Sequence, residues 1–172
     1  MDPARWRVDP KGTPMKKDIY FDNYFGPGWP EIRELEPYFL APKGKEWFYT
    51  GGNDSGGISL EGLDGTEHLP LGRGRKDIEL AMWGNPEHGV LLQYSRIGGG
   101  VPRQDWFSRG DTTRLREWVR TLHNDPMPVG LYIPFAEAWK AVKEFMETEG
   151  QLPTSIAWIM GDDLPEGTFP DP

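Results

Sequence analysis

The clearest pattern of apolar and polar positions lies in residues 134–150, around the stretch AEAWKAVKEFMETEG. Apolar side chains recur there every three or four residues and charged side chains fill the other positions, which predicts an amphipathic helix. Pro134 and Gly150 bracket the pattern at positions where helices begin and end. The predicted apolar face comprises Phe135, Ala138, Trp139, Val142, Phe145 and Met146. Such a helix must lie on a second apolar surface.

The strands that supply this surface are predicted from short apolar runs. TSIAWIM, residues 154–160, follows Pro153 and is too short for another helix, so we expect an interior strand on which the helix packs. DIELAMWG and GVLLQYSRI flank the turn NPEH and predict the strongest hairpin in the chain. KEWFYTGG and GGISLEGL predict a second hairpin across the glycine-rich loop GGNDSGG.

Three further segments carry weaker patterns. KKDIYFDNYF, residues 16–25, suits a first strand, and WPEIRELEPYFL suits a helix that begins near Pro30 and is kept short by Pro37. QDWFSRG suits a strand. TTRLREWVRTLH, residues 112–123, fits either a helix capped by Asp111 or a long exposed strand, and the strand is favoured.

Together these elements predict an α+β fold. We expect a mostly antiparallel sheet with one long C-terminal helix and a short N-terminal helix packed on one face. Residues 1–15 contain three prolines and little periodicity, so they are expected to form a flexible arm, with residues 16–172 as a single domain.

Composition narrows the classes of function. The net charge of −8 and pI near 4.9 argue against nucleic-acid binding, which needs a basic surface, and they suit a basic partner or simply solubility. The chain has no cysteine, which excludes disulfides and thiolate metal sites. No apolar run is long enough for a membrane helix, and the N-terminus lacks the pattern of a secretory signal. A cytoplasmic location is expected.

Candidate catalytic groups have simpler explanations. Ser55 lacks the glycine spacing of a nucleophile elbow, and LGRGRKD matches no phosphate-binding motif. The three histidines are far apart in the sequence, so no metal site is expected. No cofactor is expected either. Asp162 and Asp163 are adjacent, and neighbouring residues of an extended chain point in opposite directions. An acidic loop that contacts solvent or a partner is the favoured interpretation.

The hairpin IELAMWGNPEHGVLLQY and the segment IPFAEAWKAVKEFMETEGQLPTSIAW resemble the first-numbered family of immunity proteins from bacterial polymorphic-toxin systems. The resemblance covers roughly residues 78–158. After the hairpin at Asn85 it is carried by Phe145, Gly150, Pro153, Ile156 and Trp158.

The resemblance implies an antitoxin without catalytic activity. Such a protein binds a cognate toxin domain, here expected to be basic and to act on nucleic acid as a deaminase or nuclease, and occludes its active site. An acidic inhibitor can be steered to a basic groove. The candidate partner-binding residues are Asp54 in the glycine-rich loop, Asp64 and Glu67 in the next loop, Asp162 and Asp163 after the last strand, and Trp106 as an aromatic anchor.

Two alternatives remain open from the sequence. One is a hydrolase that uses carboxylates such as Glu46, Asp54 and Asp162, which requires a concave pocket where at least two carboxyl groups meet. The other is an adaptor module without a toxin partner. A binder instead predicts acidic side chains spread over an exposed face.

Overall fold

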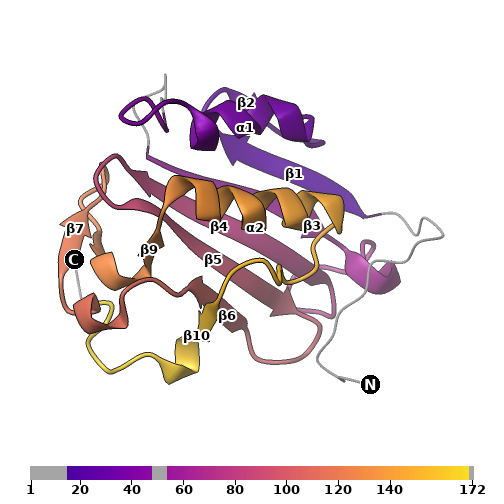
Figure 1. The fold of residues 1–172 in the computed structure, drawn as a ribbon. Helices are drawn as coiled ribbons and strands as arrows, with labels where there is room; N and C mark the ends of the chain where they lie inside the picture. The colour runs from indigo at the N-terminus through magenta and orange to yellow at the C-terminus, as the bar shows by residue number, and fades with distance from the viewer. Residues whose placement is uncertain (1–14, 48–53, 171–172) are drawn as a thin grey trace.

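The structure, a computed structural model, describes residues 15–47 and 54–170 (Figure 1). Its two helices are α1 (Ile32–Leu40) and α2 (Phe135–Glu147). The main strands are β1 (Lys16–Phe21), β2 (Tyr24–Phe25), β3 (Ser55–Glu61), β4 (Lys76–Asn85), β5 (Gly89–Gly98), β6 (Gln104–Ser108), β9 (Tyr132–Ile133) and β10 (Trp158–Met160). A separate ribbon consists of β7 (Trp118–Arg120) and β8 (Pro126–Pro128), and single turns of 3₁₀ helix are η1 (Leu63–Gly65), η2 (Thr112–Arg114), η3 (Val129–Leu131) and η4 (Gly161–Asp163).

The main strands form one eight-stranded sheet. Its order is β10-β6-β5-β4-β3-β1-β2, with β9 pairing with β5 beside this path, and each of these pairings is antiparallel. The long hairpin of β4 and β5 therefore lies at the centre of the sheet. An antiparallel sheet with two helices confirms the predicted α+β class.

A large aromatic core fills the space between the sheet and the helices. Figure 1 shows α2 crossing one face of the sheet, with α1 beside it. Because successive strand residues point to opposite faces, alternate side chains such as Leu80 and Tyr94 meet this core. Phe145 of α2 is fully buried, and Phe39 of α1 lies 5.3 Å from the Trp139 ring. Burial of these large rings is the main source of stability on this face.

A smaller apolar cluster covers one end of the opposite face. It joins side chains of β5 and β6 to the segment that contains η2, β8, η3 and β9, and it consists of Leu91, Phe107, Leu115, Met127, Leu131 and Tyr132. Trp83, Val119, Ile159 and Leu164 pack against it. The β7–β8 ribbon is thus held on the sheet by a second core.

The two strongest predicted elements are present. Helix α2 begins after Pro134 as its N-cap, and Gly150 follows it at φ +97° with its N–H donating to the Phe145 carbonyl at 2.9 Å. A Cβ on Gly150 would lie 2.5 Å from Leu60, so close packing also requires glycine there. In the β4–β5 turn, the Asn85 carboxamide oxygen accepts hydrogen bonds from two backbone N–H groups of the turn.

Helix α1 differs slightly from its prediction. Glu31, not Pro30, is the N-cap, and its backbone N–H donates to the Glu34 carboxylate at 2.6 Å. The helix continues through Pro37 and ends at Leu40. The proline therefore lies inside the last turns of the helix and does not end it.

Two strand predictions are wrong. The segment TSIAWIM does not form an interior strand, because only β10 within it is extended, and β10 pairs with β6 alone at the edge of the sheet. The predicted hairpin of KEWFYTGG with β3 is also not formed, because β1 and β4 occupy the two sides of β3. Residues 45–47 of that segment are not extended into a strand, and residues 48–53 lie outside the described part of the chain.

Residues 112–123 adopt neither of the two long elements considered for them. Asp111 does act as a cap, accepting a hydrogen bond from the Thr113 N–H at 3.0 Å, but the helix that follows is the single turn η2. Only β7 is a strand. The predicted N-terminal arm falls almost wholly on residues 1–14, which are not described, whereas residues 16–61 supply three strands and a helix that complete the sheet and its core.

Candidate functional site

Asp54 lies at the start of β3, where it connects the sheet to the β7–β8 ribbon. Its Oδ2 accepts a hydrogen bond from the Leu122 N–H at 3.0 Å, and its Oδ1 is buried without a hydrogen-bond donor among the described residues. Burial, and then the negative charge of Asp54, raises the pKa of Tyr132. Asp54 is therefore half-buried and holds a neighbouring segment in place.

Asp64 and Glu67 lie beyond the other end of β3, in the loop that leads to β4. Both are exposed. Asp64 has φ +55° and pairs with Lys76 at 3.2 Å, which fixes its carboxylate beside the start of β4. β3 is seven residues long, so roughly 23 Å separates this loop from Asp54. The two candidate positions belong to opposite ends of the sheet.

Asp162 and Asp163 lie in η4, directly after the edge strand β10, and both are exposed. The last residue of β10, Met160, pairs with Trp106. The residues in register with Trp106 include Tyr94 on β5 and reach the middle of β3. The chain passes this row when it leaves β10, so η4 lies nearer the end of the sheet that carries Asp64. Four exposed acids thus flank one end of the sheet.

Trp106 is half-buried on β6 and packs against the large core. Its ring stands edge-on to Tyr94 at 5.6 Å, and the Arg96 guanidinium lies 4.9 Å from its centre. The most exposed tryptophan of the described residues outside the core is Trp118, on β7, with 40% of its surface accessible. The structure therefore places Trp118, not Trp106, where an aromatic side chain meets solvent.

The three carboxylates considered for a hydrolase are not brought together. Glu46 accepts a hydrogen bond from the Gly44 N–H of its own loop at 2.7 Å, and Asp54 is bonded to Leu122. Asp162 follows β10, which is four strand positions away from β3, or roughly 19 Å. Within residues 15–47 and 54–170, no group of three or more His, Asp or Glu side chains could hold a metal ion.

A row of polar side chains that the sequence analysis did not single out crosses the open part of the sheet opposite the helices. The register aligns Asp18, Ser59, Glu79, Ser95 and Asp105 on five neighbouring strands. Alternation within each strand is visible in the sequence, but the register that aligns the five residues is not. The row brings together acids that are far apart in the chain.

Glu79 in the middle of this row and Asp105 at its end differ in electrostatics. Burial raises the pKa of Glu79, and the positive charge of Arg103 only partly opposes it. Burial would also raise the pKa of Asp105, but hydrogen bonds from Ser95, Arg103 and Gln93 outweigh it and lower this pKa. The Ser95 hydroxyl donates to Asp105 at 2.6 Å. Acids with opposite pKa shifts suit acid–base chemistry, but neither of these two lines the cavities beside the start of α2.

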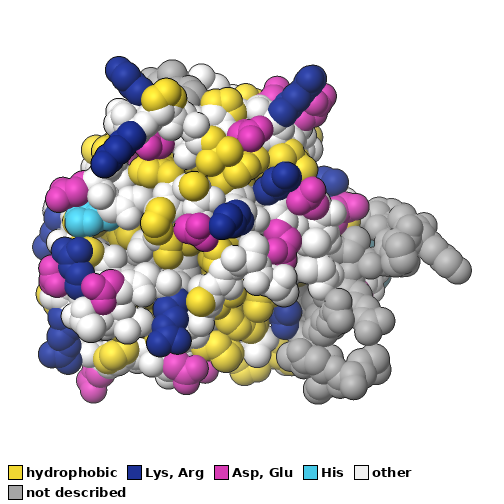
Figure 2. Space-filling view, viewed as in Figure 1, with side chains coloured by type: hydrophobic (Ala, Val, Ile, Leu, Met, Phe, Trp, Pro, Cys, Tyr) yellow, Lys and Arg dark blue, Asp and Glu magenta, His cyan; other side chains and the backbone are white. Residues whose placement is uncertain are grey.

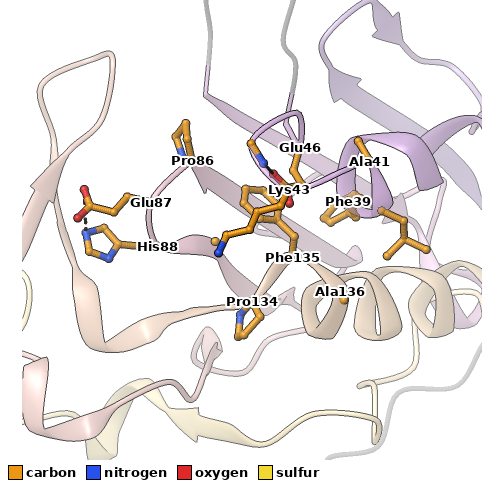
Figure 3. Close-up of a pocket in the computed structure, with 13 residues that line it drawn as sticks. Phe39, Ala41, Lys43, Glu46, Pro86, Glu87, His88, Pro134, Phe135 and Ala136 are labelled. Carbon is orange, nitrogen blue, oxygen red and sulfur yellow. Dashed lines mark hydrogen bonds and ion pairs between the residues drawn. The ribbon is translucent and has the colours of Figure 1, made fainter.

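A cavity of about 610 Å³ lies between α1, the β4–β5 turn and the start of α2. Figure 3 shows Glu87 and His88 on the hairpin side, and Phe39 and Ala136 on the side of the helices. Its lining combines apolar side chains with charged residues of both signs, namely Lys43, Glu46 and Glu87. A second cavity of about 450 Å³ lies where β6 and β9 meet the start of α2, and its lining includes Arg109, Tyr132 and Glu137.

Charges on the face that carries the helices are mixed. Figure 2 shows Lys and Arg side chains interspersed with Asp and Glu across this face, with apolar side chains between them. The net charge of −8 therefore does not form a single acidic patch on this side.

Residues 79–159 match the family model described as Immunity protein Imm1. The match begins in β4, includes β5, β6 and α2, and ends in β10, so it covers the centre of the sheet and the helix upon it. Comparison with curated proteins and with solved structures gives no match. Over residues 79–159 the chain is thus similar to the Imm1 immunity proteins, which confirms the resemblance inferred from the sequence.

Proposed function

We propose that this protein is an antitoxin that binds a cognate toxin of a bacterial polymorphic-toxin system and occludes its active site. The observation that carries the proposal is the match of residues 79–159 to the Imm1 immunity proteins. The arrangement of the described carboxylates supports a binding role, because the three considered for catalysis are separated, and two of them accept hydrogen bonds from backbone N–H groups of other residues. The proposed activity is therefore inhibition by contact, without catalysis.

The toxin is proposed to act on nucleic acid, as a deaminase or a nuclease. Enzymes of this kind present a basic groove to their substrate, and a protein with a net charge of −8 is attracted to such a groove before contact. We place the encounter in the cytoplasm of the cell that makes the antitoxin. In the described residues, no helix has both the length and the apolar character needed to cross a bilayer.

The contact is proposed to lie at the end of the sheet flanked by Asp64 and Glu67 on one side and Asp162 and Asp163 on the other. All four are exposed, and the span of about four strands between them fits within a protein–protein interface of standard size. In this proposal Asp54 and Trp106 contribute indirectly, because both are half-buried and hold their surroundings in place.

The test is co-expression with the toxic domain encoded beside this gene, scored by survival and by co-purification. Antitoxin function predicts survival and a stable complex. The contact surface is tested by D64K/E67K against E36K/E147K, which makes the same change in net charge at exposed positions on the two helices. Weaker binding for the first pair alone supports the proposed contact, and equal binding for both pairs removes it.

The two alternatives predict different results in the same experiment. An adaptor module without a toxin partner would neither rescue growth nor form the complex. A hydrolase would lose the ability to rescue growth when its carboxylates are substituted, and its binding to the toxin would not change. Glu79 and Asp105, which have opposite pKa shifts on nearby strands, are the carboxylates to substitute in that case.

A further inference from the structure

A short segment of this acidic protein is basic. Residues 109–123 contain four arginines and two carboxylates, a net charge of +2 in a chain whose net charge is −8. Arg114 pairs with Glu117 at 3.0 Å. Arg116 and Arg120 are exposed, and among the described residues neither of them pairs with a carboxylate. Their positive charge is therefore available to a partner.

Apolar side chains are exposed beside these arginines. Trp118 has 40% of its surface accessible and Leu122 has 65%. Trp118 and Arg120 are two residues apart on β7, so they point to the same side, while Val119 between them packs on the smaller core. We call Arg116, Trp118, Arg120 and Leu122 the β7 patch. Arginine and tryptophan are the side chains most enriched at the energetic centres of protein interfaces.

Each member of the β7 patch is held by a hydrogen bond. The Trp118 indole donates to the Thr168 carbonyl at 2.9 Å, and the Arg116 guanidinium donates to the Glu166 carbonyl at 3.3 Å, so both rest on the same C-terminal segment. Arg120 donates to the Asn124 carbonyl at 2.9 Å, and the Leu122 N–H donates to Asp54. Because these hydrogen bonds already restrain the patch, its own side chains would lose less conformational entropy on binding a partner.

We propose that the β7 patch docks an acidic surface of the cognate toxin that lies outside the toxin's substrate groove. The inference rests on the proposed antitoxin function and adds a second contact of opposite polarity to the one made by the exposed acids. A protein partner is favoured over nucleic acid, because a net charge of −8 opposes phosphate and the patch offers only two unpaired arginines. Two contacts of opposite sign would fix the orientation of the toxin and exclude toxins that match only one of them.

The experiment measures the affinity for the toxin domain encoded beside this gene, with four forms of the full chain: wild type, R116E/R120E, W118A and the control R33E/R73E. The control reverses two exposed arginines outside the patch and gives the same net charge. We expect R116E/R120E to bind about tenfold more weakly or worse, and W118A about thirtyfold more weakly. The control should bind like the wild type. The thermal midpoint of each variant establishes that it is folded, and R116Q/R120Q replaces the reversal if that variant does not fold.

The outcomes separate the two proposals. If the wild type does not bind the toxin, the antitoxin function fails, and this inference fails with it. If the wild type binds and R116E/R120E binds equally well, only the β7 patch is excluded. If R116E/R120E and the control weaken binding to the same extent, the effect belongs to net charge and the patch is again excluded. If R116E/R120E lost binding to nucleic acid and still bound the toxin, the patch would be a nucleic-acid site and the proposed protein partner would be wrong.

Discussion

The two faces of the sheet are closed in different ways. On one face, two helices bury a continuous aromatic core in which Phe145 lies within 6.0 Å of both Trp29 and Tyr94. On the other face, a small cluster under the β7–β8 ribbon covers one end, and a polar row that includes Glu79 and Asp105 occupies the rest. The first face buries most of the core that stabilises the fold, and the second carries the polar row and the β7 patch.

This difference indicates where sequence change is tolerated. A large buried aromatic has many packing neighbours, so a substitution there destabilises the whole fold. The ribbon is held by six buried side chains and a few individual hydrogen bonds, such as the one from the Leu122 N–H to Asp54. An antitoxin that must follow changes in its toxin is better served by the second arrangement.

The largest expected effect is the loss of packing on the helix face. Phe145→Ala should lower the free energy of unfolding by about 3–5 kcal/mol, because a fully buried ring is removed and a cavity remains. Urea denaturation followed by tryptophan fluorescence measures this change. A loss below about 1 kcal/mol would contradict the role of this face as the scaffold.

A smaller and more local effect is expected where the ribbon is tied to the sheet. Asp54→Ala removes the acceptor of the Leu122 N–H and should lower stability by about 1–2 kcal/mol. Hydrogen exchange should increase mainly in residues 118–128. Asp54→Asn keeps an acceptor and removes the buried charge, so its loss should be smaller. An equal increase in hydrogen exchange across the whole sheet would show that the hydrogen bond to Asp54 does not stabilise the ribbon locally.

The exposed acids should affect binding and not folding. D64K/E67K should slow association with a basic toxin by about tenfold at low salt, and added salt should reduce the difference. Stopped-flow association at two or more salt concentrations measures it. The unfolding midpoint should change little, because the ion pair between Asp64 and Lys76 is partly exposed and such pairs contribute little. An unchanged association rate would remove the electrostatic part of the proposal.

The smallest effect is a dependence on pH at the polar row. The pKa of Glu79 is higher in the folded state than in the unfolded state, so the folded state binds more protons. This residue therefore makes stability fall as the pH rises from its unfolded pKa to its folded pKa. The pKa of Asp105 is lowered, so its contribution is present above its unfolded pKa and is lost as pH falls through the folded value. Glu79→Gln should therefore raise stability near neutral pH, whereas Asp105→Asn should lower it. Thermal midpoints between pH 4 and 8 distinguish the two, and equal responses would refute the assignment.

Much of the helix face could be predicted from the sequence, because α2 and the β4–β5 hairpin are encoded by local periodicity and turn residues. The edge position of β10 could not be predicted, because a short apolar run indicates a strand but does not indicate how many strands pair with it. The hairpin predicted for β3 was wrong for the same reason, because β1, which comes from an earlier part of the chain, pairs with the side of β3 that β4 leaves open.

The candidate site was less accessible to sequence reasoning. The exposure of Asp64 and Asp162 agrees with their places in polar loops, but the burial of Asp54 depends on Leu122, which is 68 residues away in the chain. Trp106 and Trp118 have similar local sequences, and only the tertiary fold places one against the large core and the other at the surface. The polar row depends on the register of five strands.

The most direct test of the central proposal is the survival of cells that express the neighbouring toxic domain together with this protein, followed by purification of the complex. Antitoxin function predicts growth in the presence of the wild type and co-elution of the two chains. Growth should be reduced for D64K/E67K and for R116E/R120E relative to their matched charge controls. Cell death with the wild type present, and no complex between the purified chains, would contradict the proposed function.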